Sequence, residues 1–214
     1  MTAKPIVVGI TGASGVPYAR RLLEVLLSSG RPVHLSVSPT GAQVWQQELG
    51  WELPLGALWD SSALRLTEGA DLELLTYFDV HDFRAPMASG SFVTGGMVIC
   101  PCSGDTLSAV AHGGAENLIR RAAEVHLKER RKLILVPRET PLSLAAIENM
   151  RLVTLAGGVI LPAAPGWYHR VRRLGDLVDF VVARILAQLD VPCDLVEPWG
   201  ETATWEPWNQ GKRP

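Results

Sequence analysis

The chain has 214 residues, of which 47% are hydrophobic and 20% charged, and its formal net charge at pH 7 is −2. This length suffices for one domain with a full hydrophobic core, and the composition excludes a disordered chain. A charge so close to neutral argues against general nucleic-acid binding. No apolar run is long enough to span a membrane and no secretory signal is evident, so we expect a cytoplasmic protein.

Apolar, β-branched runs alternate with helical patterns along the chain. In chain order, the sequence predicts a strand at 6–10, a helix at 17–27, a strand at 33–37, a helix at 41–49, strands at 74–78 and 97–102, a helix at 105–111, a basic helix within 114–131, a strand at 133–136, a helix at 142–155, a strand at 159–161 and a helix at 176–189. We interpret residues 50–70 as a variable connection and residues 79–91 as a long loop.

This alternation predicts an α/β protein with three layers, in which helices cover both faces of a Rossmann-like or flavodoxin-like parallel sheet. Residues 1–197 are expected to form a single domain. Residues 198–214 are expected to be a tail that packs on that domain or on a neighbouring subunit. Because such a sheet binds ligands at the carboxyl ends of its strands, the loops that follow the strands are the candidate site.

The cysteines point to neither a disulfide framework nor a metal site. Cys100 and Cys102 lie too close together for an ordinary disulfide, and no second pair completes a zinc site. Cys193 is the third cysteine in the chain. We expect Cys100 and Cys102 to be reduced, buried thiols, and we expect no bound metal.

A glycine-rich turn, GITGASG at residues 9–15, follows the first predicted strand and opens the first helix. Glycines allow the backbone to approach an anion closely, and a helix N-terminus offers unpaired N–H groups. The glycine spacing differs from that of the dinucleotide-binding fingerprint. An ordinary strand-to-helix turn is the alternative interpretation.

Small hydroxyl residues follow three predicted strands at the same edge of the sheet: Ser14, Ser38 and Ser103. Each could be only a helix N-cap, but their convergence favours contacts with a ligand. Ser89 and Ser91 lie in the long loop, where small residues suit close approach of a ligand, a flexible lid or an ordinary turn.

Positive charge is concentrated in one part of the sequence. Seven of the twenty Lys and Arg residues fall between Arg120 and Arg138. Arg121 and Lys128 are seven residues apart and therefore project from one helix face, while Arg138 follows the next strand. Together they indicate a site for a small anion, such as phosphate.

The alternative for the basic helix is a solvated face paired with Glu124. That alternative accounts well for Arg120, Arg130 and Arg131, which we assign to the surface or an interface. Glu139, beside Arg138, could move protons near a leaving phosphate or simply pair with its neighbour.

Three further residues are candidates near the C-terminus. Tyr168 could donate its hydroxyl to a phosphate or form the wall of an apolar pocket. Arg184 lies in an otherwise apolar helix, where an arginine usually reaches solvent or pairs at an interface. Trp199 could complete an aromatic wall, although a tryptophan in a tail more often serves packing.

Taken together, these segments resemble the flavin prenyltransferase family. The matching blocks are residues 9–15, 88–92 (ASGSF), 101–103 (PCS), 117–123 (NLIRRAA), 127–131 (LKERR), 138–139 (RE) and Tyr168. The resemblance covers nearly the whole chain and implies a fold that binds reduced FMN. It also implies transfer of a dimethylallyl group from dimethylallyl phosphate to N5 and C6 of the flavin, without a metal.

By this resemblance, the product would be prenylated FMN for a partner UbiD-type decarboxylase, and the enzyme would assemble as a dodecamer whose active sites include neighbouring subunits. The implied FMN contacts are Gly12, Ala13, Ser14, Ser38, Ser103, Gly104, Asp105, Thr106 and Arg138. The implied prenyl phosphate contacts are Ser89, Arg121, Lys128, Tyr168, Arg184 and Trp199. The implied catalytic residues are Glu139, as the acid and base, with Lys128, Arg121 and Ser14.

Two rival interpretations remain. A cysteine decarboxylase of the phosphopantothenoylcysteine type would carry a His followed by Ile-x-Leu, and a later Pro-x-Met-Asn segment. This chain instead has Asp-Phe-Arg after His81, and Pro-Arg-Glu-Thr at residues 137–140. A flavin carrier without prenyl transfer would need the FMN contacts, but not Lys128, Glu139 and Arg184 as a set.

Overall fold

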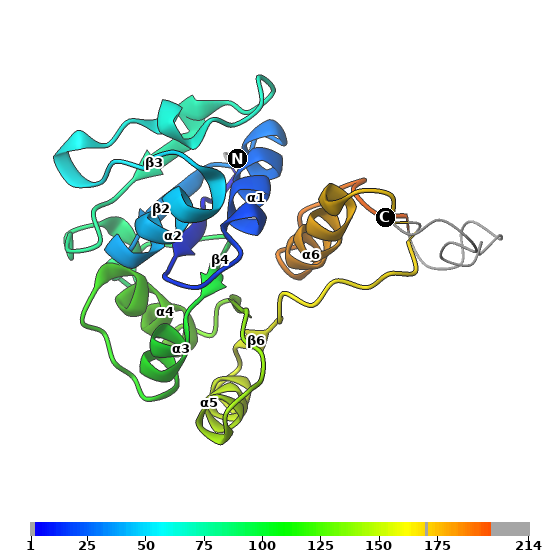
Figure 1. The fold of residues 1–214 in the computed structure, drawn as a ribbon. Coiled ribbons are helices and arrows are strands. Elements are labelled where there is room, and N and C mark those ends of the chain that lie inside the picture. Colours follow the sequence, from blue (N-terminus) through cyan, green and yellow to red (C-terminus); the bar gives the residue numbers. More distant parts are fainter. Residues whose placement is uncertain (1–2, 170, 198–214) are drawn as a thin grey trace.

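A computed structural model of the chain describes residues 3–169 and 171–197. Six parallel strands form one sheet in the order β3-β2-β1-β4-β5-β6 (Figure 1). The strands are β1 (Ile6–Ile10), β2 (Val33–Val37), β3 (Leu75–Tyr77), β4 (Gly96–Cys102), β5 (Leu133–Pro137) and β6 (Val159–Ile160). The α-helices within the described residues are α1 (Val16–Ser28), α2 (Pro39–Leu49), α3 (Gly104–Ala111), α4 (Leu118–Lys128), α5 (Leu144–Leu155) and α6 (Leu174–Gln188).

The strand order confirms the predicted Rossmann-like architecture. From β1 the chain builds outward to β2 and β3, then crosses back to β4 on the other side of β1. The strand order therefore reverses between β1 and β4, which is where open parallel sheets bind their ligands. Each crossover passes through helical or loop segments because parallel neighbours cannot be joined by a tight hairpin.

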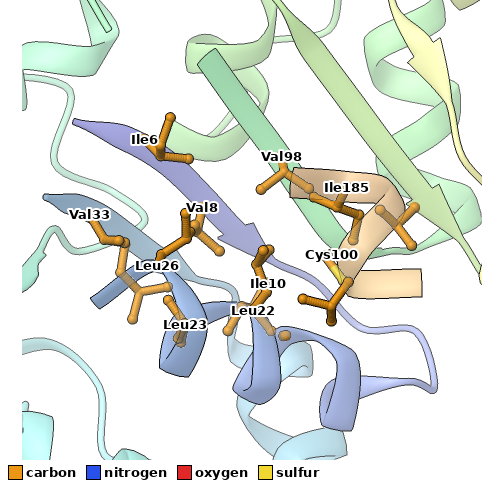
Figure 2. Packing of buried hydrophobic residues seen from close by; sticks show 14 of the residues in the cluster. Ile6, Val8, Ile10, Leu22, Leu23, Leu26, Val33, Val98, Cys100 and Ile185 are labelled. Carbon is orange, nitrogen blue, oxygen red and sulfur yellow. The ribbon is translucent and has the colours of Figure 1, made fainter. Parts of the chain in front are cut away.

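Two hydrophobic cores, one on each face of the sheet, account for the three layers. Side chains alternate along a strand, so Ile6, Val8 and Ile10 of β1 point to one face while Val7 points to the other. The first face packs against α1 and α6, as Figure 2 shows for Leu22 and Ile185 among others. The second face packs against α3, α4 and α5.

The structure departs from the sequence predictions mainly in the connections. Residues 50–70 contain two short 3-10 helices, Gly56–Leu58 and Ser61–Leu64, whose length gives too little periodicity to be recognised in a sequence. Two further 3-10 helices, Leu72–Leu74 and Pro86–Ala88, flank β3. No helix in the described ranges is long and apolar enough to cross a membrane.

Three helices begin two residues away from their predicted starts, and the first of them, α2, begins at Pro39 instead of residue 41. Helix α5 starts at Leu144 because Ser143 acts as its N-cap and accepts the Ala146 N–H at 3.1 Å. Helix α6 starts two residues earlier than predicted, at Leu174. The Asp176 carboxylate accepts the backbone N–H groups of Arg172 and Arg173, which stabilises this earlier start.

Candidate functional site

A cavity of about 520 Å³ lies at the carboxyl ends of β1, β4 and β5, beside the point where the strand order reverses. The loops after these three strands form one side of it, and α3 and α5 form the other. The lining residues are Gly12, Ala13, Ser14, Cys102, Ser103, Gly104, Leu107, Ser108, Pro137, Arg138, Glu139, Pro141, Ser143, Ala145, Ala146, Asn149 and Met150. This is the edge of the sheet at which the sequence predicts the candidate site.

The loops after β1 and β4 are locked to each other by one buried hydroxyl. Thr11 is 3% exposed, and its Oγ1 donates to the Pro101 carbonyl at 2.9 Å while accepting the Ser103 N–H at 2.8 Å. The Thr11 N–H donates to the same carbonyl at 3.2 Å. These bonds fix Ser14 and Ser103 across the mouth of the cavity. Sequence reasoning passed over Thr11 as part of a glycine-rich turn.

The N-terminus of α1 already holds an anion, the side chain of Glu48. Its carboxylate accepts the Gly15 N–H at 2.9 Å and the Val16 N–H at 3.0 Å. Gly15 has a φ of 115°, a conformation that favours glycine and that turns these N–H groups toward α2. The first turn of α1 therefore satisfies its unpaired donors with a carboxylate that the sequence did not associate with this loop.

Two of the three predicted hydroxyl residues act as helix caps. Ser38 accepts the Gly41 N–H at 3.0 Å at the start of α2, and it is not among the residues that line the cavity. Ser103 accepts the Thr106 N–H at 3.2 Å at the start of α3, yet it also lines the cavity. Ser14 lines the cavity as well.

The predicted residues that follow Ser103 divide between the cavity and the outer surface. Gly104 lines the cavity. Thr106 is buried, and its hydroxyl accepts from Ser103 Oγ at 2.9 Å. Asp105 is exposed and forms an ion pair with Arg120. Only the first of these three is open to a ligand in the cavity.

Arg138 and Glu139 follow β5 and both line the cavity, as the sequence predicted. The Nε atom of Arg138 is buried without a hydrogen-bond partner. Asn149 of α5 is 9% exposed and lines the same space, and sequence reasoning missed it. An unsatisfied buried donor is costly, so an acceptor that came within hydrogen-bond distance of this Nε would be favoured. An arginine, two serine hydroxyls and small residues in one cavity are the groups that a phosphorylated ligand such as FMN needs.

A second group of predicted residues gathers on α4 and the segment that packs against it, residues 86–92, which we call the serine loop. Arg121 donates from Nε to the Ala88 carbonyl at 3.1 Å and from Nη1 to Glu124 at 2.7 Å. Lys128 donates to Glu129 at 2.6 Å. Ser89 is exposed, and its hydroxyl lies 2.9 Å from that of Ser91. Arg121 and Lys128 therefore share one helix face, as predicted.

The sequence pattern assigns Arg120, Arg130 and Arg131 to the surface or an interface, and within one chain the surface assignment holds for only one of them. Arg120 is 13% exposed and binds both Asp105 and Glu116. Arg131 is 16% exposed and donates to backbone carbonyls of the serine loop. Only Arg130 is exposed as expected. The side chains of Arg120 and Arg131 are mostly covered because they reach partners outside α4, which a helical wheel does not include.

A third group lies beside α6. Arg184 lines a smaller pocket of about 240 Å³ together with β6 residues and Phe180. The Tyr168 ring packs edge-on against Phe180 at 5.6 Å. Neither Tyr168 nor Arg184 is among the residues lining the larger cavity. Trp199 and the rest of the predicted tail lie outside the described residues.

Buried titratable groups near these sites are held neutral. Burial raises the pKa of the Cys100 and Cys102 thiols well above their ordinary value. Burial also lowers the pKa of His126 to about 4, assisted by the positive charge of Arg131. Within the described part of the chain, no cluster of three or more His, Cys, Asp or Glu side chains could hold a metal ion.

The chain matches the sequence model of the family described as Flavoprotein over residues 1–186. It is 50% identical over 198 residues to the flavin prenyltransferase UbiX of Pseudomonas aeruginosa, covering 92% of this chain and 94% of that protein. It is similar to the solved structure of AnUbiX (PadA1) in complex with FMN and dimethylallyl pyrophosphate, with a TM-score of 0.81, 36% identity and coverage of 95% and 100%. A dodecameric FMN-dependent UbiX-like decarboxylase from Escherichia coli O157:H7 has a TM-score of 0.78 at 33% identity, with coverage of 91% and 98%.

Proposed function

The chain belongs to the flavin prenyltransferases of the Flavoprotein family, and from this premise we propose that it transfers a dimethylallyl group from dimethylallyl phosphate to N5 and C6 of reduced FMN. Phosphate leaves, and the product is prenylated FMN. The observation that carries this proposal is the cavity at the reversal of strand order. Arg138 there has a buried, unpaired donor and Glu139 is its neighbour.

The residues that would hold FMN are those at the ends of β1, β4 and β5. Gly12, Ala13 and Gly104 allow the flavin to approach the backbone closely, and Ser14 and Ser103 offer hydroxyls. The Arg138 guanidinium would bind an anionic oxygen through charge-assisted hydrogen bonds. Three of the predicted FMN contacts would support the site indirectly, because their side chains stabilise the helices that border it: Ser38, Asp105 and Thr106.

When bound, reduced FMN supplies two nucleophilic atoms, N5 and C6, whose bonds to the dimethylallyl carbons close a fourth ring. Glu139 lines the cavity, where its side chain would accept the protons that N5 and C6 release, returning one to C2 of the dimethylallyl group and one to the departing phosphate. Ser14, on the opposite loop, would orient the reacting groups. These two side chains supply proton transfer and positioning without a metal.

Neutralising the leaving phosphate requires cations, which Lys128, Arg121 and Arg184 supply together with hydroxyls from Ser89 and Tyr168. Within one chain these residues lie on α4, on the serine loop and beside α6, and none of them lines the FMN cavity. We therefore propose that neighbouring subunits of a homo-oligomer, a dodecamer, complete each active site. The relative from Escherichia coli is described as dodecameric.

We further propose that the prenylated FMN passes to a UbiD-type decarboxylase in the cytoplasm. The proposed reaction releases this flavin as a product and does not use it. Its consumption therefore belongs to a second protein.

The test is direct. Purified protein is incubated anaerobically with reduced FMN and dimethylallyl phosphate, and the flavin is analysed by mass spectrometry. Flavin alkylated at N5 and C6, absent when the donor is omitted, supports the proposal. Flavin binding without any gain of mass supports the carrier interpretation instead. Release of CO2 from a phosphopantothenoylcysteine substrate supports the cysteine decarboxylase interpretation.

A further inference from the structure

The side chain of Arg131 holds the serine loop against the end of α4. Arg131 is not one of the residues predicted to bind the phosphate. Arg131 donates from Nη1 to the Phe92 carbonyl at 2.6 Å and from Nη2 to the Gly90 carbonyl. These two acceptors lie on either side of Ser91. The planar fork of an arginine can bind two such carbonyls at once, which the single ammonium of a lysine cannot do with the same geometry.

The backbone conformation at the end of α4 determines the direction in which the Arg131 side chain leaves the helix. Arg130 has a φ of 55° and ends the helix in the left-handed conformation. The Arg130 N–H bonds to the Leu127 carbonyl at 3.1 Å, and the Arg131 N–H bonds to the His126 carbonyl at 2.8 Å. This pair of bonds is a Schellman motif, which fixes the backbone of the residue that follows the left-handed position. Local structure at the end of α4 therefore fixes the backbone from which the Arg131 side chain extends to the serine loop.

The serine loop is anchored on both sides of its hydroxyl groups. Arg121 binds the Ala88 carbonyl just before Ser89. After Ser91, the Phe92 ring stacks on His34 with centroids 5.4 Å apart and an interplanar angle of 11°. Arg131 binds the segment between these anchors.

Lys128 approaches the same segment closely. A Cβ atom on Gly90 would lie only 2.8 Å from Lys128 Nζ and 2.3 Å from Glu129 Oε1. The Lys128 ammonium therefore lies next to Gly90, the residue that follows Ser89, so the path of the loop sets how far the Ser89 hydroxyl lies from this cation. A cation and hydroxyls fixed in advance bind a phosphate ester without first losing conformational entropy.

We infer that Arg131 is a positioning residue for the phosphate of the prenyl donor: it clamps the Gly90 and Phe92 carbonyls so that Ser89 and Lys128 are presented together. This inference rests on the proposed function. In this role Arg131 acts through the loop backbone, because each of its two terminal nitrogens donates to a carbonyl of the serine loop. It lies on elements separate from the FMN cavity, so its loss should affect the donor and spare the flavin.

The experiment compares Arg131→Ala and Arg131→Lys with Arg84→Ala, which removes a 98% exposed arginine from the loop that precedes the serine loop. FMN affinity should stay within about twofold of wild type in all three variants. The KM for dimethylallyl phosphate should rise about tenfold or more in Arg131→Ala, less in Arg131→Lys and not in Arg84→Ala. Amide hydrogen exchange in Arg131→Ala should become faster at residues 89–92 and not in β1 or β5.

Added guanidinium ion should lower the KM of Arg131→Ala toward the wild-type value, which a general loss of folding would not allow. A KM within about twofold of wild type in Arg131→Ala, or unchanged exchange at residues 89–92, would overturn the inference. If Arg131→Ala does not fold, the KM for dimethylallyl phosphate and the exchange at residues 89–92 are measured in Arg131→Lys and decide the question.

If wild-type protein forms no prenylated flavin, the proposed function fails. Titration with dimethylallyl phosphate alone, together with the exchange data, then still tests the clamp.

Discussion

The hydroxyl of Thr11 lies 2.8 Å from the backbone nitrogen of Ser103, although 92 residues separate the two in sequence. The same hydroxyl donates to the Pro101 carbonyl. A proline in a strand cannot donate to the ladder, and the β4–β5 register shifts between Ile99 and Cys102. Thr11 supplies side-chain bonds where β4 is irregular, and it thereby sets the distance between the two loops that would hold FMN.

Thr11→Val should uncouple the loops that follow β1 and β4, while it preserves the shape of the side chain at residue 11. The change leaves the part-buried Ser103 N–H without this acceptor, which we expect to reduce the free energy of unfolding by about 1–3 kcal/mol. FMN should also bind more weakly. Urea denaturation and flavin fluorescence titration measure the two effects. Thr11→Ser retains the hydroxyl and is the control; equal loss in both variants would mean that the methyl group, not the hydrogen bonds, matters.

Glu139→Gln should separate binding from turnover. The amide keeps the size of the side chain but cannot accept a proton, so we expect FMN affinity close to wild type and a fall in kcat of about 100-fold or more. Stopped-flow spectroscopy of the flavin and mass spectrometry of the product provide the measurement. Full activity in this variant would remove Glu139 from the proton transfer. Glu148→Gln, which changes an exposed carboxylate of α5 paired with Arg151, is the matched control.

Gly90→Ala should disturb the prenyl phosphate site without affecting the fold. The new Cβ would meet Glu129 Oε1 at 2.3 Å and Lys128 Nζ at 2.8 Å, and both are ends of flexible side chains that can move away. We expect a raised KM for dimethylallyl phosphate and an unchanged melting temperature. Gly175→Ala is the control, because its Cβ would meet nothing closer than 3.7 Å. A KM unaffected by Gly90→Ala would argue that Lys128 does not act from this position.

His126 should make the protein less stable in mild acid. Its Nδ1 lies 2.7 Å from the Ala122 carbonyl, which can only accept, so Nδ1 carries the proton and Nε2 accepts from Thr94 at 2.7 Å. Burial lowers the pKa of this imidazole from 6.5 to about 4 in the folded protein. The unfolded chain therefore binds a proton first as the pH falls, and stability is lost between pH 6.5 and about 4.

Unfolding in urea at pH 7 and at pH 5 measures this effect. We expect His126 to account for a loss of about 2 kcal/mol between these two pH values, which is absent in His126→Gln. His81→Gln removes an exposed imidazole and should keep the wild-type dependence. Identical pH dependence in wild type and His126→Gln would contradict the assignment.

The sequence by itself determined the sheet, its parallel strands and the edge at which the site lies. Strand and helix patterns repeat in alternation, and the carboxyl ends of parallel strands must meet at one edge. Gly12, Ser103 and Arg138 could therefore be assigned to one cavity although they are far apart in the chain. Regular backbone structure depends on local periodicity, which a single sequence carries.

Only the tertiary structure decided which side chains bind distant backbone. Thr11, Glu48 and Arg131 each satisfy N–H or carbonyl groups more than thirty residues away. Nothing in their local sequence distinguishes them from a turn residue, a helix-end carboxylate and a solvated cation. A hydrogen bond of a few ångströms between remote segments depends on how helices and loops pack on the sheet. Composition and periodicity do not encode that arrangement residue by residue.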